Sequence, residues 1–186
     1  MRQMISTIRA LLVLLFVAAP LSTIAADYTD RAALDELFAE LKTATTAAEA
    51  ADLTQQIWSV WFNPDVPELK ARMGKAGIAM NVGDMSAALS LLSAIVTDYP
   101  DYAEGWNQRA TLYFELGNLD SSLADIEKVL ALEPRHFGAL SGRVLIYLKQ
   151  GKRADALRDM IAALAIDPYL GEKALFPELS QNTTNV

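Results

Sequence analysis

The stretch GWNQRATLYFELGNLDSSLADIEKVLALEP, from Gly105 to Pro134, decides the fold. Apolar residues recur at helical spacing before Gly117, and they recur again between Gly117 and Pro134. Glycine tolerates the tight turn that follows a helix, and proline ends a helix because its ring forbids continuation. The stretch therefore predicts a hairpin of two helices joined at Gly117.

The same order of helix, glycine, helix and proline returns at an interval of 34 residues. Units that begin at Leu69, Ala103 and Phe137 share small or apolar residues in the same columns. A repeat of this length is typical of a solenoid, in which each unit buries its apolar face against its neighbours. The repeated residues include Gly83, Gly117 and Gly151; Pro100, Pro134 and Pro168; Ala76, Ala110 and Val144; Ala88, Ser122 and Ala156; and Ile95, Val129 and Ala163.

These columns resemble those of the tetratricopeptide repeat (TPR), whose unit is a pair of helices. The first helix of the middle unit has the expected aromatic and small residues at Trp106, Ala110 and Tyr113. The third unit also fits, whereas the first has Arg72 and Ala79 in place of the two aromatic residues. The resemblance implies an all-α, right-handed helical solenoid, and the middle unit is also similar to secreted TPR proteins of Gram-negative bacteria. The three repeats would be residues 69–102, 103–136 and 137–170.

The segment before the repeats, residues 27–68, is expected to be a helical hairpin. Apolar residues recur at helical spacing over Leu34–Leu41, and Thr46 with Glu49 forms a capping box that begins a second helix. Solenoids need caps because a terminal repeat would otherwise expose an apolar face. We therefore expect a degenerate repeat whose aromatic run, Trp58–Phe62, seals the face of the first repeat.

The segment after the repeats, residues 171–186, is expected to hold a second cap and a polar tail. A short helix there would carry three apolar residues over the last helix of the third repeat. The tail from Ser180 onward has no apolar periodicity and is predicted to be disordered. The three capping residues are Leu175, Phe176 and Leu179.

Residues 1–26 have the order of a secretory signal peptide. A short basic region precedes ten apolar residues at Ala10–Ala19, and Pro20 and several small residues follow. The apolar run is too short to cross about 30 Å of hydrocarbon comfortably. A mitochondrial presequence and an uncleaved anchor are the alternatives. The chain has no cysteine that could carry a lipid, so we expect export to the periplasm without a stable membrane anchor.

The remaining residues, 27–186, carry 14 basic and 23 acidic side chains, which give a formal charge of −9. This charge argues against binding to a nucleic-acid backbone. The absence of cysteine and the single histidine exclude thiolate and multi-histidine metal sites. His136 follows Pro134 and is predicted to be an ordinary loop residue rather than a general base. We therefore expect no catalytic residues, no metal and no cofactor.

One column departs from the family pattern, in which leucine is usual. The second and third repeats have Arg109 and Arg143 there, and Asp125 and Asp159 follow in the facing column of the second helix. We predict two ion pairs within repeats, Arg109–Asp125 and Arg143–Asp159. Their simplest role is to orient the two helices of each unit, because breaking a partly buried pair leaves one charge without compensation.

The resemblance places the first helix of each repeat on a concave face. At the positions that line this face in the family, the present sequence has an apolar strip with a polar rim. Such a surface suits the binding of a helix or an extended peptide. The carboxylate-clamp mode of the family is not expected, because Met73, Gly77 and Gly142 replace its polar residues. Tyr102 and His136 are expected to border the groove. Its candidate residues are Met73, Met80, Asn107, Thr111, Phe114, Ser141, Leu145 and Leu148.

The sequence thus predicts a non-enzymatic periplasmic adaptor or scaffold that binds a protein or peptide through its concave groove. A structural subunit of an envelope assembly, with its convex face as the interface, is the alternative. A small enzyme or carrier is disfavoured because no polar cluster suggests chemistry. The groove could also be filled by the N-terminal hairpin or the C-terminal tail.

Overall fold

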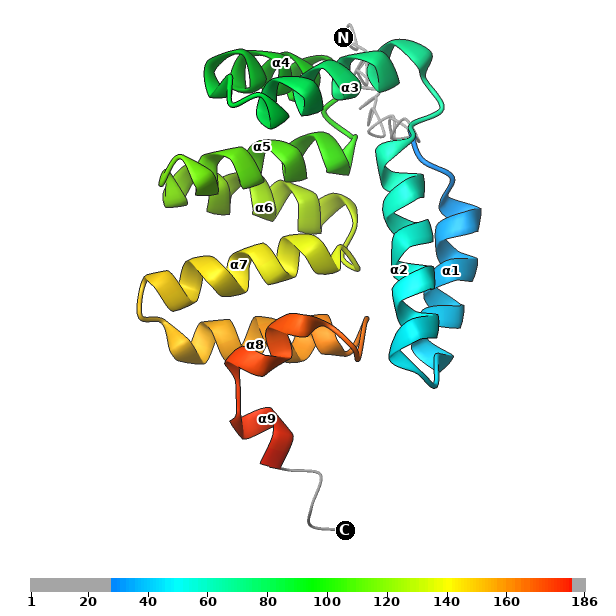
Figure 1. The fold of residues 1–186 in the computed structure, drawn as a ribbon. Coiled ribbons are helices and arrows are strands. Elements are labelled where there is room, and N and C mark those ends of the chain that lie inside the picture. The colour runs from blue at the N-terminus through cyan, green and yellow to red at the C-terminus, as the bar shows by residue number, and fades with distance from the viewer. Residues whose placement is uncertain (1–27, 182–186) are drawn as a thin grey trace, which may run out of the picture.

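Three helical hairpins stack on one another in the computed structural model, which describes residues 28–181. Each hairpin packs against the next, so the repeats form an all-α helical solenoid (Figure 1). This arrangement confirms the fold predicted from the period of the sequence. The hairpins are α3 (Pro67–Asn81) with α4 (Met85–Asp98), α5 (Ala103–Glu115) with α6 (Leu119–Leu132), and α7 (Phe137–Lys149) with α8 (Arg153–Leu164).

The turn within each hairpin has the same local cause. Gly83, Gly117 and Gly151 have φ angles of 78°, 76° and 71°, a left-handed conformation that glycine adopts without steric cost. The next residue caps the second helix in the first two units. Asp84 accepts a hydrogen bond from the backbone N–H of Ala87, and Asn118 accepts one from Ser121.

Small residues hold the two helices of a repeat close together. Ala76 and Ala88 are buried in the first unit, and Ala110 and Ser122 are buried in the second. The Ser122 hydroxyl donates a hydrogen bond of 2.7 Å to the carbonyl of Ala110, which satisfies the hydroxyl in the core. The interior of the solenoid is completed by fully buried aliphatic side chains of the second helices, including Leu92, Ile95, Ile126, Val129 and Met160.

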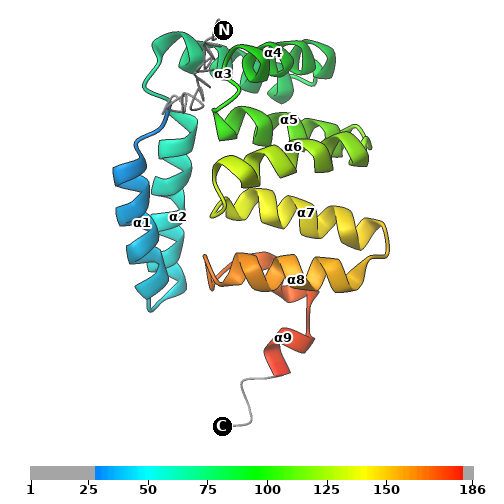
Figure 2. The same ribbon diagram turned by 180° about the vertical axis from the view of Figure 1, so that it is seen from behind.

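The N-terminal hairpin, α1 (Arg31–Thr43) and α2 (Ala47–Phe62), does not stack as a fourth unit. It runs crosswise to the other helices, along the edge where each repeat joins the next (Figures 1 and 2). The expectation that its aromatic run seals the first repeat is therefore wrong. Trp58 and Trp61 pack instead against Phe137, at the start of the third repeat.

The C-terminal cap comprises η1 (Gly171–Leu175) and α9 (Glu178–Gln181). Phe176 is fully buried in the core of the third repeat, and Leu179 packs against the same core. Leu175 was expected to contribute to this cap, but its side chain is 44% exposed. The short helical turn ends just before Phe176 and leaves Leu175 on its outer side.

The proposed signal segment and the end of the tail, residues 182–186, lie outside the described residues. Among residues 28–181, no helix combines the length and the apolar character that crossing a membrane requires.

Candidate binding groove

A cavity of about 670 Å³ lies between α5, α7 and α2. Most of its wall is apolar, and the segment that follows α8 closes one side. Its position shows that α2 forms one wall of the groove and does not fill it. The side chains that face the cavity include Thr54, Trp58 and Phe62 of α2; Asn107, Gln108, Thr111, Phe114 and Glu115 of α5; Phe137, Ser141 and Leu145 of α7; and Leu170 and Glu172.

Trp58 forms the wall opposite α5 because Gly138 gives it room. A Cβ atom at Gly138 would lie 2.5 Å from Cη2 of the Trp58 indole, closer than any real contact allows. The indole also meets the Phe137 ring edge to face at a centroid distance of 5.5 Å. The first turn of α7 is therefore shaped to receive a side chain from α2, which fixes the width of the groove.

The structure separates the candidate residues of the predicted strip into three groups. Met73 and Met80 line a second cavity of about 320 Å³ beside α3. Leu148 packs against the core of the third repeat and does not line the main cavity. Phe62 and Gln108 face both cavities and stand between them. The candidates that line the main cavity are Asn107, Thr111, Phe114, Ser141 and Leu145.

In the second and third repeats, the residue just before the first helix contacts α2, and sequence reasoning missed this role. The Tyr102 hydroxyl donates a hydrogen bond of 2.6 Å to the carbonyl of Trp61. The His136 ring stacks on the Trp61 indole at a centroid distance of 4.0 Å. Leu170 stands one repeat length after His136, beyond the helices of the third repeat. It packs against the core of the N-terminal hairpin. Burial raises the pKa of the Tyr102 phenol, and the nearby Glu104 carboxylate adds to the shift.

Tyr102 and His136 therefore do not border the groove as expected. Both side chains are buried beneath α2, and His136 is a core residue rather than an ordinary loop histidine. Its Nδ1 accepts a hydrogen bond from the backbone N–H of Ala139, which caps α7. Nδ1 is thus unprotonated, and Nε2 carries the proton that is donated to Glu104 at 3.0 Å.

Glu104 forms the centre of a buried polar cluster beneath the groove. It lies in the first turn of α5, and its side chain is fully buried. Its carboxylate accepts hydrogen bonds from Asn107 Nδ2 at 3.2 Å, from Gln108 Nε2 at 2.6 Å, and from His136. These bonds satisfy the buried charge and hold the Asn107 and Gln108 side chains in place at the cavity wall.

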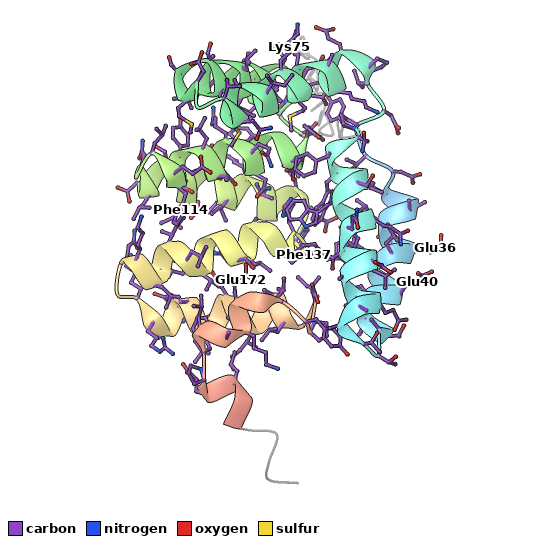
Figure 3. All side chains as sticks on the ribbon, in the orientation of Figure 1. Glu36, Glu40, Lys75, Phe114, Phe137 and Glu172 are labelled. Carbon is purple, nitrogen blue, oxygen red and sulfur yellow. The ribbon has the colours of Figure 1, made fainter. Side chains whose placement is uncertain are left out.

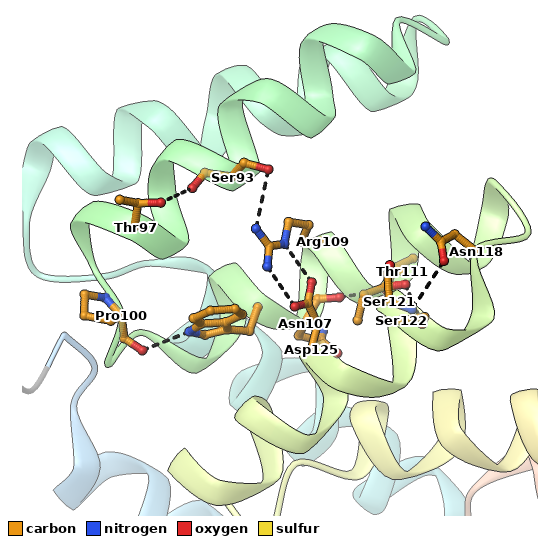
Figure 4. Close-up of polar contacts among 12 residues, drawn as sticks. Ser93, Thr97, Pro100, Asn107, Arg109, Thr111, Asn118, Ser121, Ser122 and Asp125 are labelled. Atoms are coloured by element: carbon orange, nitrogen blue, oxygen red, sulfur yellow. Dashed lines mark hydrogen bonds and ion pairs between the residues drawn. The ribbon is translucent and has the colours of Figure 1, made fainter.

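The structure brings together both proposed ion pairs. Arg109 donates to the two carboxylate oxygens of Asp125 at 2.7 and 2.8 Å, and Arg143 contacts Asp159 in the same way at 2.6 and 2.9 Å. Figure 4 shows Arg109 between Asp125 and Ser93 of the preceding repeat. The hydrogen bonds from Asp125 raise the pKa of Arg109 above its ordinary value. Neither pair lines the main cavity, so their contribution is to the packing of the helices.

The polar groups that remain at the cavity can donate and accept hydrogen bonds. The Ser141 hydroxyl is buried and has no hydrogen-bond partner. Glu115 and Glu172 are the charged residues of the lining, and neither has an ion-pair partner within residues 28–181. Such a site can hold an apolar group of a ligand, exchange hydrogen bonds with a polar group beside it, and attract a cation.

Comparison with known proteins agrees with the geometry of the stack. The tetratricopeptide repeat family model matches residues 103–136, the second repeat. A TPR repeat-containing protein of Rhizobium etli is 39% identical over 81 residues, which are 44% of this chain and 40% of that protein. The aligned part thus spans less than half of the length of this relative.

Two solved structures share the fold at low sequence identity. The first TPR domain of Spaghetti (RPAP3), bound to an HSP90 peptide, is 20% identical with a TM-score of 0.58, and the match covers 65% of this chain and 97% of that one. MamA is 19% identical with a TM-score of 0.51, and the match covers 70% of this chain and 76% of that one. Because the identities are low, the two similarities concern the arrangement of the helices alone.

Proposed function

We propose that this chain, which is built from tetratricopeptide repeats, is a non-enzymatic adaptor that binds a protein or peptide between α2, α5 and α7. The cavity of about 670 Å³ is the observation that carries this proposal. Its size is within the usual range for ligand sites, which are mostly apolar with a few placed polar groups. Exposed lining residues such as Thr111 and Phe62 leave the cavity accessible to a partner.

The structural neighbour bound to an HSP90 peptide supports a peptide as the class of ligand. The manner of binding would differ from a carboxylate clamp, because the positions of the clamp residues hold Met73, Gly77 and Gly142. Met73 is buried in the core of the first repeat, and the two glycines have no side chain to donate hydrogen bonds. Recognition would instead depend on shape and on the apolar walls.

We also propose that the protein works in the periplasm after removal of residues 1–26. The basic start, the apolar run and the small residues that follow support this location. Fractionation of cells that express the full chain, with N-terminal sequencing of the product, tests it directly. We expect a periplasmic product that begins near Ala26 or Asp27, and an unprocessed cytoplasmic product would contradict the proposal.

Site-specific photocrosslinking tests the groove as the binding surface. A crosslinking amino acid at Thr111 faces the groove, and one at Ile161 lies on an exposed part of α8 as the matched control. We expect a protein adduct from Thr111 that disappears when Leu145→Asp places a charge in the cavity wall. Circular dichroism of the Leu145→Asp variant shows whether it remains folded.

The alternative is a structural subunit that uses its convex face. Its supporting observation is the exposure of Ile161, whose side chain is 52% accessible on the outer side of α8. In that case the adduct would come from Ile161 and not from Thr111, and Leu145→Asp would leave it unchanged. This outcome would replace the groove proposal with the alternative.

A further inference from the structure

The main cavity is lined by a polar group that has no hydrogen-bond partner among residues 28–181. Four hydroxyl-bearing residues line the cavity, namely Thr54, Thr111, Ser122 and Ser141. The first three donate to the backbone carbonyls of Ala50, Asn107 and Ala110 at 2.7, 3.0 and 2.7 Å.

Ser141 differs from these three residues. A helical serine can return its hydroxyl to the carbonyl four residues earlier, but Ser141 makes no such bond and its Oγ is buried without a partner. The side chain is only 6% exposed, so an unpaired hydroxyl there is unfavourable. A ligand that offers a carbonyl or an amide to Ser141 would relieve this cost.

The charged side chains that line the cavity are both acidic. Glu115, at the end of α5, and Glu172, in η1, are the two charged residues of the lining. Figure 3 shows Glu172 in front of α7, between Phe114 and Phe137 in that view. Lys149 reaches the same rim, but its Nζ lies 4.9 Å from the centre of the Phe114 ring and therefore already interacts with an aromatic face.

The walls between these carboxylates are apolar. Trp58 stands on one side, and Phe114 and Leu145 stand on the other. Apolar walls exclude water and strengthen the attraction of a nearby carboxylate for a cation. The combination therefore favours a ligand that has an apolar group beside a positive charge, and it disfavours a ligand whose apolar group is flanked by acidic residues.

We infer that the groove selects a peptide segment in which a bulky apolar side chain stands next to lysine or arginine. The apolar side chain occupies the space between Trp58, Phe114 and Leu145, and the basic side chain lies toward Glu115 and Glu172. A backbone group of the segment pairs with the Ser141 hydroxyl. This inference rests on the proposed function and specifies the chemistry of its partner.

Selection of a random linear peptide library, displayed on phage, against the full chain after removal of residues 1–26 tests the inference. We expect the enriched sequences to carry lysine or arginine within a few residues of an aromatic or aliphatic residue. The tightest synthetic peptide of this pool is then measured by fluorescence anisotropy. Because exposed ion pairs are screened, its affinity should decrease as the salt concentration rises.

Charge reversal provides the matched comparison. The Glu115→Lys/Glu172→Lys variant should bind the selected peptide about tenfold more weakly. The Glu36→Lys/Glu40→Lys variant has the same change in net charge on the exposed side of α1 (Figure 3) and should bind as the wild type does. Equal effects of the two variants would mean that net charge, and not the rim, attracts the peptide, and would overturn the inference.

The Ser141→Ala variant tests the base of the cavity separately. Removing an unpaired buried hydroxyl should leave the free energy of unfolding unchanged or slightly higher, while peptide affinity should fall by about threefold to tenfold. An unchanged affinity would remove Ser141 from the site.

The failures of the two proposals are distinguishable. If enriched peptides lose binding with Leu145→Asp but show no excess of basic residues, the groove stands and the inference about its ligand fails. If no enriched peptide is sensitive to Leu145→Asp, the proposed function fails as well. Enrichment of acidic peptides would also overturn the inference, because the lining would then attract the opposite charge.

Discussion

The first repeat and the two later repeats have the same hairpin but different surroundings. Ile78 of α3 corresponds in register to Leu112 of α5 and Ile146 of α7. Ile78 is 65% exposed, whereas Leu112 and Ile146 are fully buried. The preceding helices α4 and α6 cover α5 and α7, but no described helix covers α3 in that way (Figure 1). The repeat thus fixes the packing within a unit, and the neighbour decides the burial between units.

The ion pairs also distinguish the first repeat from the two later repeats. Arg109 and Arg143 pair with acids of their own second helix, and Arg109 also donates to Ser93 of the preceding repeat at 3.4 Å. The first repeat has Lys75 and Leu91 in the corresponding columns. Lys75 is exposed on the outer side of α3 (Figure 3). A basic residue at the open end of the stack remains hydrated and needs no buried acid.

The largest expected effect comes from truncating the column that contains Ile78 and Leu112. Leu112→Ala should lower the free energy of unfolding by about 2–5 kcal/mol, because it leaves a cavity between α4 and α5. Ile78→Ala should change it by less than about 0.5 kcal/mol, because the side chain is mostly in water. Urea denaturation followed by circular dichroism measures both. A comparable loss for Ile78→Ala would show that α3 is covered in solution and would remove the difference between the repeats.

A smaller effect is expected from the ion-pair column. Asp125→Ala should lower the free energy of unfolding by about 2 kcal/mol, less than for a fully buried pair because Arg109 can partly reach water. Lys75→Ala, its counterpart in the first repeat, should have almost no effect. The double variant Arg109→Ala/Asp125→Ala completes a mutant cycle. If the single effects simply add, the pair contributes nothing, and the later repeats do not differ from the first in this respect.

The parts of the fold that the sequence could predict are those in which interacting residues recur within one unit. Arg109 and Asp125 are 16 residues apart along the chain, and the spacing returns at Arg143 and Asp159. The position of the N-terminal hairpin could not be predicted in this way, because its contacts join segments that are far apart in the sequence. Tyr102 bonds the carbonyl of Trp61 across 41 residues of sequence, and no local pattern predicts that contact.

The groove was predicted only in part, because the sequence did not reveal which residues of the repeats contact the N-terminal hairpin. The column that begins with Tyr102 continues with His136 and Leu170, which have a phenol, an imidazole and an aliphatic side chain. All three contact the N-terminal hairpin, but their chemistry differs, so they did not stand out as one docking column. The sequence did not reveal where α2 packs against the repeats. It therefore could not show that Trp58 forms a wall of the cavity or that Leu148 lies outside it.

The smallest effect concerns a column near the end of each repeat, which contains Tyr99, Glu133 and Asp167. Burial tends to raise the pKa of Glu133, but hydrogen bonds from the Arg135 side chain and backbone outweigh it and hold the pKa below its usual range. Arg135 also contacts Asp35 of α1 at 2.7 Å, so this pair links the second repeat to the hairpin. Tyr99 of the first repeat has no such ionic link and meets the Tyr28 ring instead.

Because the folded-state pKa of Glu133 is lowered, its contribution to stability is present above the ordinary pKa and is lost as the pH falls through the lowered value. The wild type should therefore be more stable than Glu133→Gln at pH 7, and the difference should shrink as the solution becomes acidic. Tyr99→Phe should show no such change, because the first repeat has no carboxylate at this position to pair with an arginine. Denaturation curves from neutral to acidic pH measure both. A pH-independent difference for Glu133→Gln would mean that the second repeat holds the hairpin by packing alone, as the first repeat does at Tyr99.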